Sequence, residues 1–495
     1  MANKIACEKC AAFAKHFIDT VVDGASISRR LCEEHYHEFR KDQMLRPVTE
    51  RVASSKATVV TASPSAEAWR QLIELIHVES SSAVMVVTGG GASAISELLS
   101  VPGGSRTLLE AVVPYSEAAL VEWLGKAPEQ FCVEETALAM AAVAYRRACG
   151  LAAKKDEERG EKREERKDAV VDSLSVPRES FREDTIGVAC TASLVSDRPK
   201  KGEHRCHVAT QTWRSTESCT LVLEKGARDR AGEERLVGKL ILLALARAAK
   251  IGNLPPLDLL PGESLVEYAA PADGRLPGLI EGPYRILWSV PLRDDDEERG
   301  AKSEKGGSTD VNSLFSLHSS LHCPPPVGIL CGSFHPLHDG HRQLRAAAER
   351  ILKGPVYYEL SVRNVDKPPL DFLSIDRRRA QFTDVPLALT AAPTFAEKAA
   401  VLPGVVFVVG VDTAERIVQP KYYGGGEAAT REALEQIRSA GCRFLVAGRM
   451  VGGRFETLAD VAVPPEFSAI FTAIPPEEFR ADVSSTQLRS DATAE

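Results

Sequence analysis

The sequence lacks any apolar run long enough to cross a bilayer, and its first residues, MANKIACEKC, lack the apolar core of a signal peptide. We therefore expect no membrane partner and a cytoplasmic or nuclear location. An excess of positive charge is also absent, since the net charge is −8. That balance disfavours general nucleic-acid binding but leaves room for a local basic cleft that takes a small phosphate ligand.

Internal repeats are absent, and so is a disulfide pattern, because eleven cysteines are an odd number scattered over a long chain. Reduced thiols with one metal site explain them better. The composition, 44% hydrophobic and 26% charged, is that of a globular protein, and 495 residues predict two or three domains. Composition divides the chain into four regions. They are residues 1–49, residues 60–253 with a charged insertion at 154–180, a connecting region at 254–322 with a flexible linker, and residues 323–495.

The first region contains two pairs of metal-binding side chains. Cys7 and Cys10 form CxxC, and Cys32 and His35 form CxxH. Two such pairs can supply the four ligands of a structural Zn²⁺ ion, which would also stabilise a segment with few large apolar residues. His37 is an alternative fourth ligand, and free cysteines on a helix are the alternative to a zinc module.

The second region contains the run VMVVTGGGASAISELLSVPGGSRTLLEAVVPYS, which predicts a strand, a triple-glycine turn and a helix. Such a turn can present backbone N–H groups to an anion, or it can simply join strand to helix. With CVEETALAMAAVAYRRA and GVACTASLVSDRP, this region resembles the C-terminal domain of competence-damage CinA proteins, a family that includes nicotinamide mononucleotide amidases. The matching positions are Thr88, Gly89, Gly90, the VPGxS piece, Tyr115 and the EETA helix.

The departures from the CinA pattern concern its chemistry. Val86 stands where the amidases carry a nucleophilic serine, and Ser116 stands where a lysine follows the tyrosine. The TGxAGP loop is replaced by residues 191–194, and Ser93 could serve as nucleophile only if the loop shifted. The resemblance therefore implies an α/β domain that keeps the fold, can bind a nucleotide-like ligand and lacks amidase activity.

Beyond residue 323, short apolar strands alternate with helical patterns: VGIL, HRQLRAAAERIL, VYYELSV and IDRRRAQF, then VVFVVG, CRFLVAG and FSAIFTAI. This alternation predicts an α/β domain with a doubly wound parallel sheet, the Rossmann-like arrangement.

The first strand of that domain leads into the loop CGSFHPLHDGH. We expect a helix to start near Asp339, which would cap it, with Gly332 allowing close approach of a ligand and Gly340 allowing a tight turn. His338 and His341 would then project on one side of the helix start, as cationic or hydrogen-bonding groups suited to a triphosphate. Zinc binding with His335 as a third ligand and a core position for the histidines are the alternatives.

The pattern GSFxPxHxGH resembles the signature of the nucleotidyltransferase superfamily, and VSSTQLR near the other end of the domain resembles that superfamily's ISSTxxR motif. VVGVDT resembles a segment of nicotinamide mononucleotide adenylyltransferases, although His335 stands where those enzymes carry Asn or Asp. The resemblance implies His338, His341 and Arg489 as catalytic residues, and the departure at His335 marks it as an acceptor-binding residue. The loop at 364–369 could present the acceptor phosphate to Lys367, or its Pro-Pro turn could simply follow a strand. The resemblance also implies nucleotide contacts from Gly332, Ser333, Phe334, Gly340, Asp412, Ser484, Ser485 and Thr486.

These features predict an enzyme that transfers a nucleoside monophosphate, adenylyl in first place, from ATP or CTP with Mg²⁺ to a phosphate-bearing acceptor, with release of pyrophosphate. Nicotinamide or nicotinate mononucleotide is the acceptor that the resemblance suggests, which would place the protein in NAD biosynthesis. The alternatives are a cytidylyltransferase and a non-catalytic nucleotide sensor or scaffold.

Overall fold

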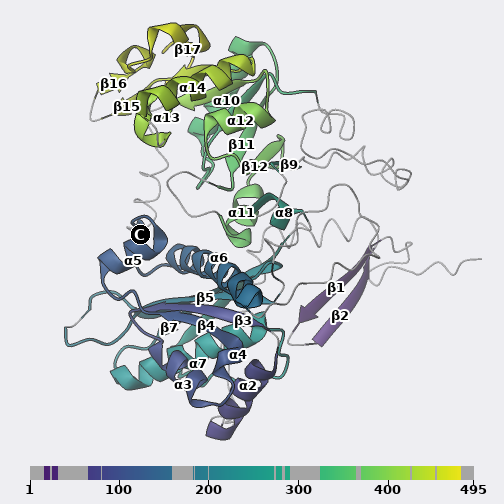
Figure 1. Ribbon diagram of the computed structural model, residues 1–495, viewed down its shortest axis with the longest axis vertical. Coiled ribbons are helices and arrows are strands. Elements are labelled where there is room, and N and C mark those ends of the chain that lie inside the picture. Colours follow the sequence, from purple (N-terminus) through teal and green to yellow (C-terminus); the bar gives the residue numbers. More distant parts are fainter. Residues whose placement is uncertain are drawn as a thin grey trace, which may run out of the picture.

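The computed structural model describes residues 16–22, 25–31, 65–79, 81–158, 182, 184–198, 200–272, 275–280, 285–289, 324–363, 370–423, 426–451 and 454–480. Two mixed α/β units make up most of these residues (Figure 1). We call residues 65–272 the middle half and residues 275–480 the C-terminal half. The predicted α/β class is therefore confirmed.

The middle half contains a six-stranded sheet in the order β4-β3-β5-β6-β7-β8. β3 is parallel to β4 and β5, and the remaining neighbours are antiparallel. The strands are β3 (Ser82–Thr88), β4 (Leu108–Val112), β5 (Thr185–Ser193), β6 (His204–Gln211), β7 (Ser215–Leu223) and β8 (Ser264–Pro271). β3 ends at the triple-glycine turn, as its apolar run predicts.

Helices cover both faces of this sheet (Figure 1). They are α2 (Ala66–Val78), α3 (Ala92–Ser100), α4 (Gly104–Thr107), α5 (Glu117–Leu124), α6 (Glu134–Glu158) and α7 (Arg230–Ala248). The alanine-rich α6 lies close to β5. Gly187 on β5 allows this approach, since a Cβ at that position would come within 2.2 Å of the carbonyl oxygen of Ala141 on α6. α6 runs to Glu158, so the first residues of the predicted charged insertion continue a packed helix.

The C-terminal half contains a seven-stranded sheet in the order β17-β14-β13-β10-β11-β12-β9. All neighbours are parallel except β12 and β9. The strands are β9 (Ile286–Ser289), β10 (Gly328–Cys331), β11 (Val356–Ser361), β12 (Leu387–Thr390), β13 (Val406–Gly410), β14 (Arg443–Ala447) and β17 (Phe471–Ala473). The order reverses between β10 and β13, and open α/β sheets bind ligands beyond the carboxyl ends of their strands at such a point.

The helices of this half are α8 (Leu276–Ile280), α10 (Asp339–Leu352), α11 (Phe372–Arg379), α12 (Phe395–Val401), α13 (Val411–Val418) and α14 (Gly426–Ser439). Short elements complete it: η4 (Pro420–Tyr422), β15 (Arg449–Val451), β16 (Arg454–Glu456), η5 (Leu458–Asp460) and η6 (Pro465–Ile470). The apolar segment FSAIFTAI, predicted as one strand, is divided between η6 and β17. A hydrogen bond from the backbone N–H of Phe467 to Pro464 begins this turn and shortens the strand.

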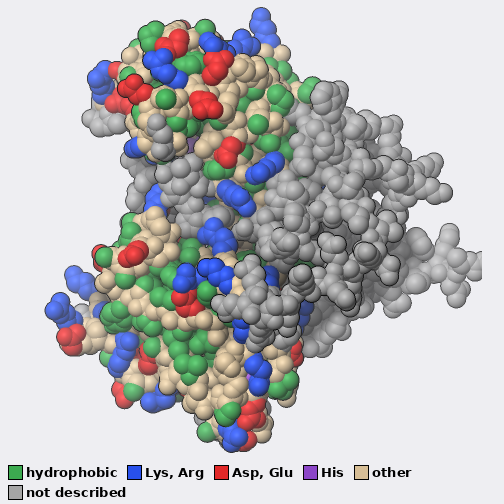
Figure 2. Space-filling model, in the orientation of Figure 1, with side chains coloured by type: hydrophobic (Ala, Val, Ile, Leu, Met, Phe, Trp, Pro, Cys, Tyr) green, Lys and Arg blue, Asp and Glu red, His purple; other side chains and the backbone are tan. Residues whose placement is uncertain are grey.

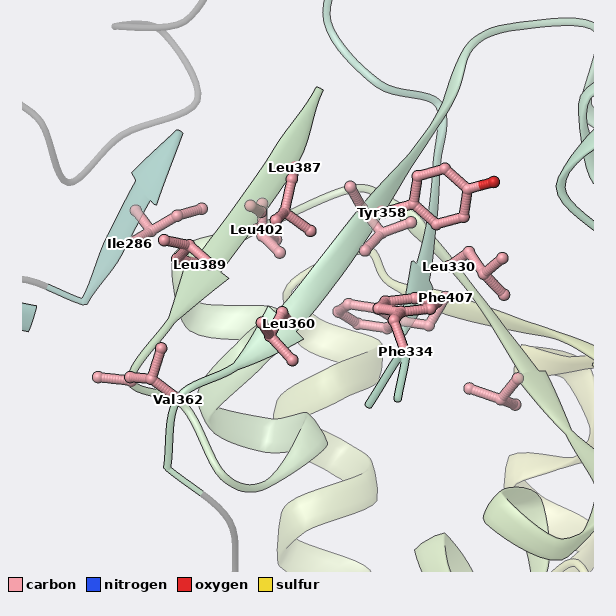
Figure 3. Packing of buried hydrophobic residues seen from close by; sticks show 14 of the residues in the cluster. Ile286, Leu330, Phe334, Tyr358, Leu360, Val362, Leu387, Leu389, Leu402 and Phe407 are labelled. Atoms are coloured by element: carbon pink, nitrogen blue, oxygen red, sulfur yellow. The ribbon is translucent and has the colours of Figure 1, made fainter. Parts of the chain in front are cut away.

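One hydrophobic cluster extends across both halves, with Leu138 from α6, Leu279 from α8 and Phe372 from α11, and a second cluster lies within the middle half. Figure 3 shows part of the first cluster around β10, β11 and β12. The region predicted to connect the domains supplies a strand to each sheet, because β8 pairs with β7 and β9 pairs with β12. Its linker part, near residues 294–310, lies outside the described residues.

The first region shows one hairpin, β1 (His16–Val22) paired with β2 (Ala25–Leu31). The predicted zinc ligands Cys7, Cys10, Cys32 and His35 lie outside the described residues on either side of it. Among the residues that are described, no group of three His, Cys, Asp or Glu side chains could hold a metal ion. Every helix in the same ranges is too short or too polar to span a membrane.

Candidate functional site

The predicted signature loop joins β10 to α10, and two neighbouring elements hold it. The backbone N–H of Gly332 donates to the carbonyl oxygen of Glu359 on β11, at 3.1 Å. The side chain of Gln381, just beyond α11, accepts from the N–H of Leu337 at 2.7 Å and donates to the carbonyl of Phe334 at 3.0 Å. The loop is therefore fixed at both ends and in the middle.

The ring of Phe334 is buried rather than presented to a ligand. It lies among the side chains of β10 and β11 (Figure 3) and contacts Tyr358, Phe382 and His341 edge-on. A Cβ on Gly332 would come within 2.7 Å of this ring, so glycine is required here to let Phe334 pack. Only the backbone of Phe334 remains available for the nucleotide contact that the resemblance implies.

His338 and His341 lie together at the start of α10, with their rings stacked at 3.8 Å between centroids. His338 is the N-cap residue and Asp339 is the first helical residue, so the expectation that Asp339 caps the helix is wrong. Asp339 lies one position too late in the chain, and its exposed carboxylate faces Arg342 at 3.5 Å. The backbone N–H of His338 donates to Nδ1 of His341 at 3.2 Å, which leaves the proton of the neutral His341 ring on Nε2.

The surroundings of both imidazoles favour their neutral forms. Burial lowers the pKa of His338. Burial, together with the positive charges that His338 and Arg342 can carry, lowers the pKa of His341 to about 4. Of the two roles expected for these residues, the lowered pKa values therefore favour hydrogen-bond donation over cationic binding.

A cavity of about 360 Å³ opens at the carboxyl ends of β10, β11, β12 and β13, and we call it the C-terminal cavity. Its size is within the range of small-molecule sites. It is lined by Lys126, Cys331, Gly332, Ser333, Glu359, Leu360, Ser361, Val362, Leu370, Arg378, Pro393, Thr394, Phe395, Lys398, Thr413, Arg416, Ile417, Tyr422 and Tyr423.

An ion pair lies buried in the wall of this cavity. Nζ of Lys398 is 2.5 Å from Oε1 of Glu359, and the hydroxyl of Thr390 donates to the same oxygen. Both charged side chains are almost fully buried, so each needs the other to compensate its charge away from water. Burial and the nearby Glu359 raise the pKa of the Cys331 thiol well above its usual range, so this cysteine is no thiolate nucleophile.

The structure brings only some of the predicted site residues together. Gly332 and Ser333 line the C-terminal cavity, whereas His335, His338, Gly340 and His341 do not. Asp412 lies in the first turn of α13, where its carboxylate pairs with Arg449 at 3.2 Å, and its neighbour Thr413 lines the cavity instead. Lys367, Ser484, Ser485, Thr486 and Arg489 lie outside the described residues.

A second cavity, of about 500 Å³, lies in the middle half at the triple-glycine turn. We call it the middle cavity; it is lined by Val87, Thr88, Gly89, Gly90, Ala92, Val113, Tyr115, Asp229, Arg230, Ala231 and Glu234. Four of the positions that carry the CinA resemblance, Thr88, Gly89, Gly90 and Tyr115, therefore line one cavity, whereas the VPGxS piece and the EETA helix do not. Asp229, Arg230 and Glu234, from the start of α7, also line it, and no motif in the sequence pointed to them.

Two N–H groups where the triple-glycine turn enters α3 already have an anionic partner. Glu234 accepts from the backbone N–H of Gly91 and of Ser93, both at 3.0 Å, and so caps α3 from another helix. Arg230 donates to the carbonyl of Gly89 at 3.0 Å. A carboxylate of this chain thus occupies the place where an anionic ligand would bind a helix N-terminus.

The middle cavity is lined neither by Val86, at the position of the family's serine, nor by the alternative nucleophile Ser93. Val86 is fully buried in β3. Ser93 lies in the first turn of α3, where its hydroxyl donates to the carbonyl of Glu234 at 3.0 Å. A Cβ on Gly238 would come within 2.1 Å of that hydroxyl, so α7 packs directly on it.

Solved structures of competence-damage proteins are similar to part of this chain. The competence/damage inducible protein CihA from Agrobacterium tumefaciens is 15% identical, with a TM-score of 0.24, over 39% of this chain and 96% of that one. A competence or damage-inducible protein from Enterobacter asburiae is 13% identical, with a TM-score of 0.25, over 37% and 96%. A CinA superfamily protein from Enterobacter cloacae is 13% identical, with a TM-score of 0.25, over 40% and 100%. No protein-family model and no curated protein matches the chain.

Proposed function

We propose that the C-terminal half is a nucleotidyltransferase that transfers a nucleoside monophosphate, adenylyl in first place, from a nucleoside triphosphate to a phosphate-bearing acceptor. The supporting observation is the position of the signature loop. It leaves β10 where the strand order reverses, and its residues Gly332 and Ser333 line a cation-rich cavity. The order and direction of the strands also support a Rossmann-like sheet.

The proposed reaction needs no covalent enzyme intermediate. A phosphate oxygen of the acceptor forms a bond to the α-phosphorus, the bond from that phosphorus to the bridging oxygen breaks, and pyrophosphate leaves. The neutral His341 would donate its Nε2 proton in a hydrogen bond to the charge that develops on the phosphates. The VSSTQLR motif would bind the remaining phosphates of the triphosphate through Ser484, Ser485, Thr486 and Arg489.

Mg²⁺ would accompany the triphosphate, where it neutralises phosphate charge. Glu359 is the one carboxylate among the cavity-lining residues given above, and it is paired with Lys398. The described part of the wall therefore fits an ion held through phosphate oxygens and water rather than through a protein carboxylate cluster.

The test is an assay for pyrophosphate with the full chain, Mg²⁺, ATP or CTP, and a panel of phosphorylated acceptors that includes nicotinamide and nicotinate mononucleotide. We expect His341→Ala to lower the rate about 100-fold or more. In His341→Asn the side-chain oxygen can still accept the hydrogen bond from His338, but the Nε2 donor is lost. This variant should therefore lower the rate by a similar factor. Gln343→Ala, an exposed change on the same helix, is the matched control.

Non-catalytic nucleotide binding is the second candidate, and one observation favours it. Neither His338 nor His341 lines the C-terminal cavity, so a ligand can occupy that cavity without meeting them. Saturable binding of ATP or CTP without pyrophosphate from any acceptor would reject the transferase and leave the sensor. Preference for CTP over ATP in turnover would instead identify a cytidylyltransferase.

We also propose that the middle half lacks amidase activity and that the first region binds a structural Zn²⁺ ion. Deamidation of nicotinamide mononucleotide by the full chain would refute the first proposal. Metal analysis of the purified protein tests the second. A stoichiometric Zn²⁺ content that is lost in the double variant Cys7→Ser with Cys10→Ser is the expected result.

A further inference from the structure

The C-terminal cavity is built by both halves of the molecule. Lys126 belongs to the middle half, where it follows the end of α5 at Gly125, yet it lines the same cavity as Gly332 and Ser333 of the signature loop. The other lining residues named above come from the C-terminal half. A cation from the middle half is therefore part of the proposed site.

The charge of this wall is unbalanced. Glu359 is the carboxylate among its lining residues, and its ion pair with Lys398 cancels both charges. Three further cations line the wall, Lys126, Arg378 and Arg416, and Arg378 also lies near the carboxylate of Asp371, the N-cap residue of α11. Within the described ranges, Lys126 and Arg416 form no ion pair. Figure 2 shows Lys and Arg side chains gathered where the two halves meet.

Consecutive arginines of α11 connect the junction to the cavity. Arg377 binds the carboxylate of Glu134, at the start of α6, at 2.8 and 3.1 Å. Arg378, the next residue, donates to the carbonyl of Ser333 at 3.2 Å and lines the cavity. The backbone N–H of Phe372 also donates to the hydroxyl of Thr216 on β7, at 3.0 Å. The contacts of Arg377 and Phe372 join the two halves, and Glu134 follows the loop that begins at Lys126.

We propose that Lys126 of the middle half, with Arg378 and Arg416 of the C-terminal half, binds a phosphate group of the ligand in the C-terminal cavity. Three cations around one cavity fit a phosphate better than any neutral group, and guanidinium groups match phosphate geometry well. The middle half would then serve the transferase as part of its binding site, independently of any chemistry of its own. The claim that the bound phosphate belongs to a transferase substrate rests on the proposed function. The claim that these residues bind a phosphate group does not.

The experiment uses the full chain with Lys126→Ala, Lys126→Arg and the control Lys154→Ala, which removes an exposed lysine of α6 that does not line the cavity. Binding of inorganic phosphate, pyrophosphate and nicotinamide mononucleotide is measured by calorimetry at low ionic strength. We expect Lys126→Ala to weaken binding of at least one probe about tenfold, Lys126→Arg to restore most of it and Lys154→Ala to change nothing.

Kinetics then identify which ligand carries the phosphate. With a working pyrophosphate assay, Lys126→Ala should raise the KM of either the acceptor or the triphosphate about tenfold while kcat changes little, because the contact is made before the reaction. Absence of turnover in the parent would reject the transferase, yet loss of probe binding in Lys126→Ala would still support the phosphate site. A parent that binds none of the probes would overturn the inference, and so would unchanged binding and KM values in Lys126→Ala.

Discussion

Arg377 on α11 and Glu134 on α6 form a two-pronged ion pair across the junction of the two halves, with N–O distances of 2.8 and 3.1 Å. The hydroxyl of Ser218 also donates to Glu134, and the guanidinium of Arg377 lies over the ring of Tyr268 at 4.7 Å. A planar guanidinium facing a carboxylate at two points defines an orientation as well as a distance. This pair therefore helps to set how the halves are docked.

The first prediction concerns this pair. Arg377→Met and Glu134→Gln should each destabilise the protein, and the double variant should be less destabilised than the sum of the two. We expect a coupling free energy of about 1 kcal/mol, because the pair is only partly shielded from water. Urea unfolding of the four proteins measures it. Strict additivity would mean that the pair does not help hold the halves together.

The second prediction concerns the triple-glycine turn. Gly89 has φ +74°, and a Cβ there would come within 1.9 Å of the carbonyl oxygen of Ala192, whereas Gly125 has the same φ and nothing within 4 Å. Gly125→Ala should cost about 1 kcal/mol of stability from backbone strain alone. Gly89→Ala should cost ~3 kcal/mol, because the overlap adds to the strain. Equal losses in thermal unfolding would show that the turn can move away from β5.

The third prediction tests whether Glu234 occupies an anion position. Glu234→Ala leaves the N–H groups of Gly91 and Ser93 without their carboxylate and should lower stability by about 1–2 kcal/mol. Phosphate should then stabilise the variant beyond its effect on the parent, by ~1.4 kcal/mol at ten times the dissociation constant.

Melting temperatures with and without phosphate measure the effect of the Glu234 change. Glu234→Gln is the matched control, because its amide oxygen can still accept one of the two hydrogen bonds. If phosphate stabilises Glu234→Ala no more than the parent, the turn binds no anion even when it is open.

The fourth prediction concerns pH. Burial, with a smaller effect of Arg205, lowers the pKa of His207 from 6.5 to about 4, whereas Glu134 acts in the opposite direction. Between pH 6.5 and pH 4, the His207 imidazole is therefore protonated in the unfolded chain but neutral in the folded protein. The stability that His207 contributes is therefore complete above pH 6.5 and falls as the pH drops towards 4, by up to ~3 kcal/mol.

His207→Gln should flatten this dependence, because its side chain does not titrate and can still bond to Thr220, which lies 2.8 Å from Nδ1 of the histidine. The measurement is urea unfolding of parent and variant from pH 7.5 to 4.5. Subtracting one curve from the other removes the similar contributions of His338 and His341. Parallel curves would contradict the lowered pKa.

Local sequence was enough to predict many of the strands and the turns that follow them. The apolar runs before Gly89 and Cys331 predicted strands, and the glycine and proline content after them predicted turns into helices near Ala92 and Asp339. These features depend on periodicity and turn chemistry over a few residues, so they can be inferred from one sequence. The resemblance also selected Tyr115 and the glycine turn, which share the middle cavity.

Contacts between distant residues could not be predicted in this way. Glu234 caps α3 from 143 residues away, and β9, in the region predicted to connect the domains, became an edge strand of the C-terminal sheet. No motif marks Lys126, which follows a helix in one half and lines a cavity of the other. Sequence determined the class of fold and the signature loop through local periodicity and turn residues. Tertiary structure alone decided which charges meet in the cavity, because charges are brought together by packing between segments far apart in the chain.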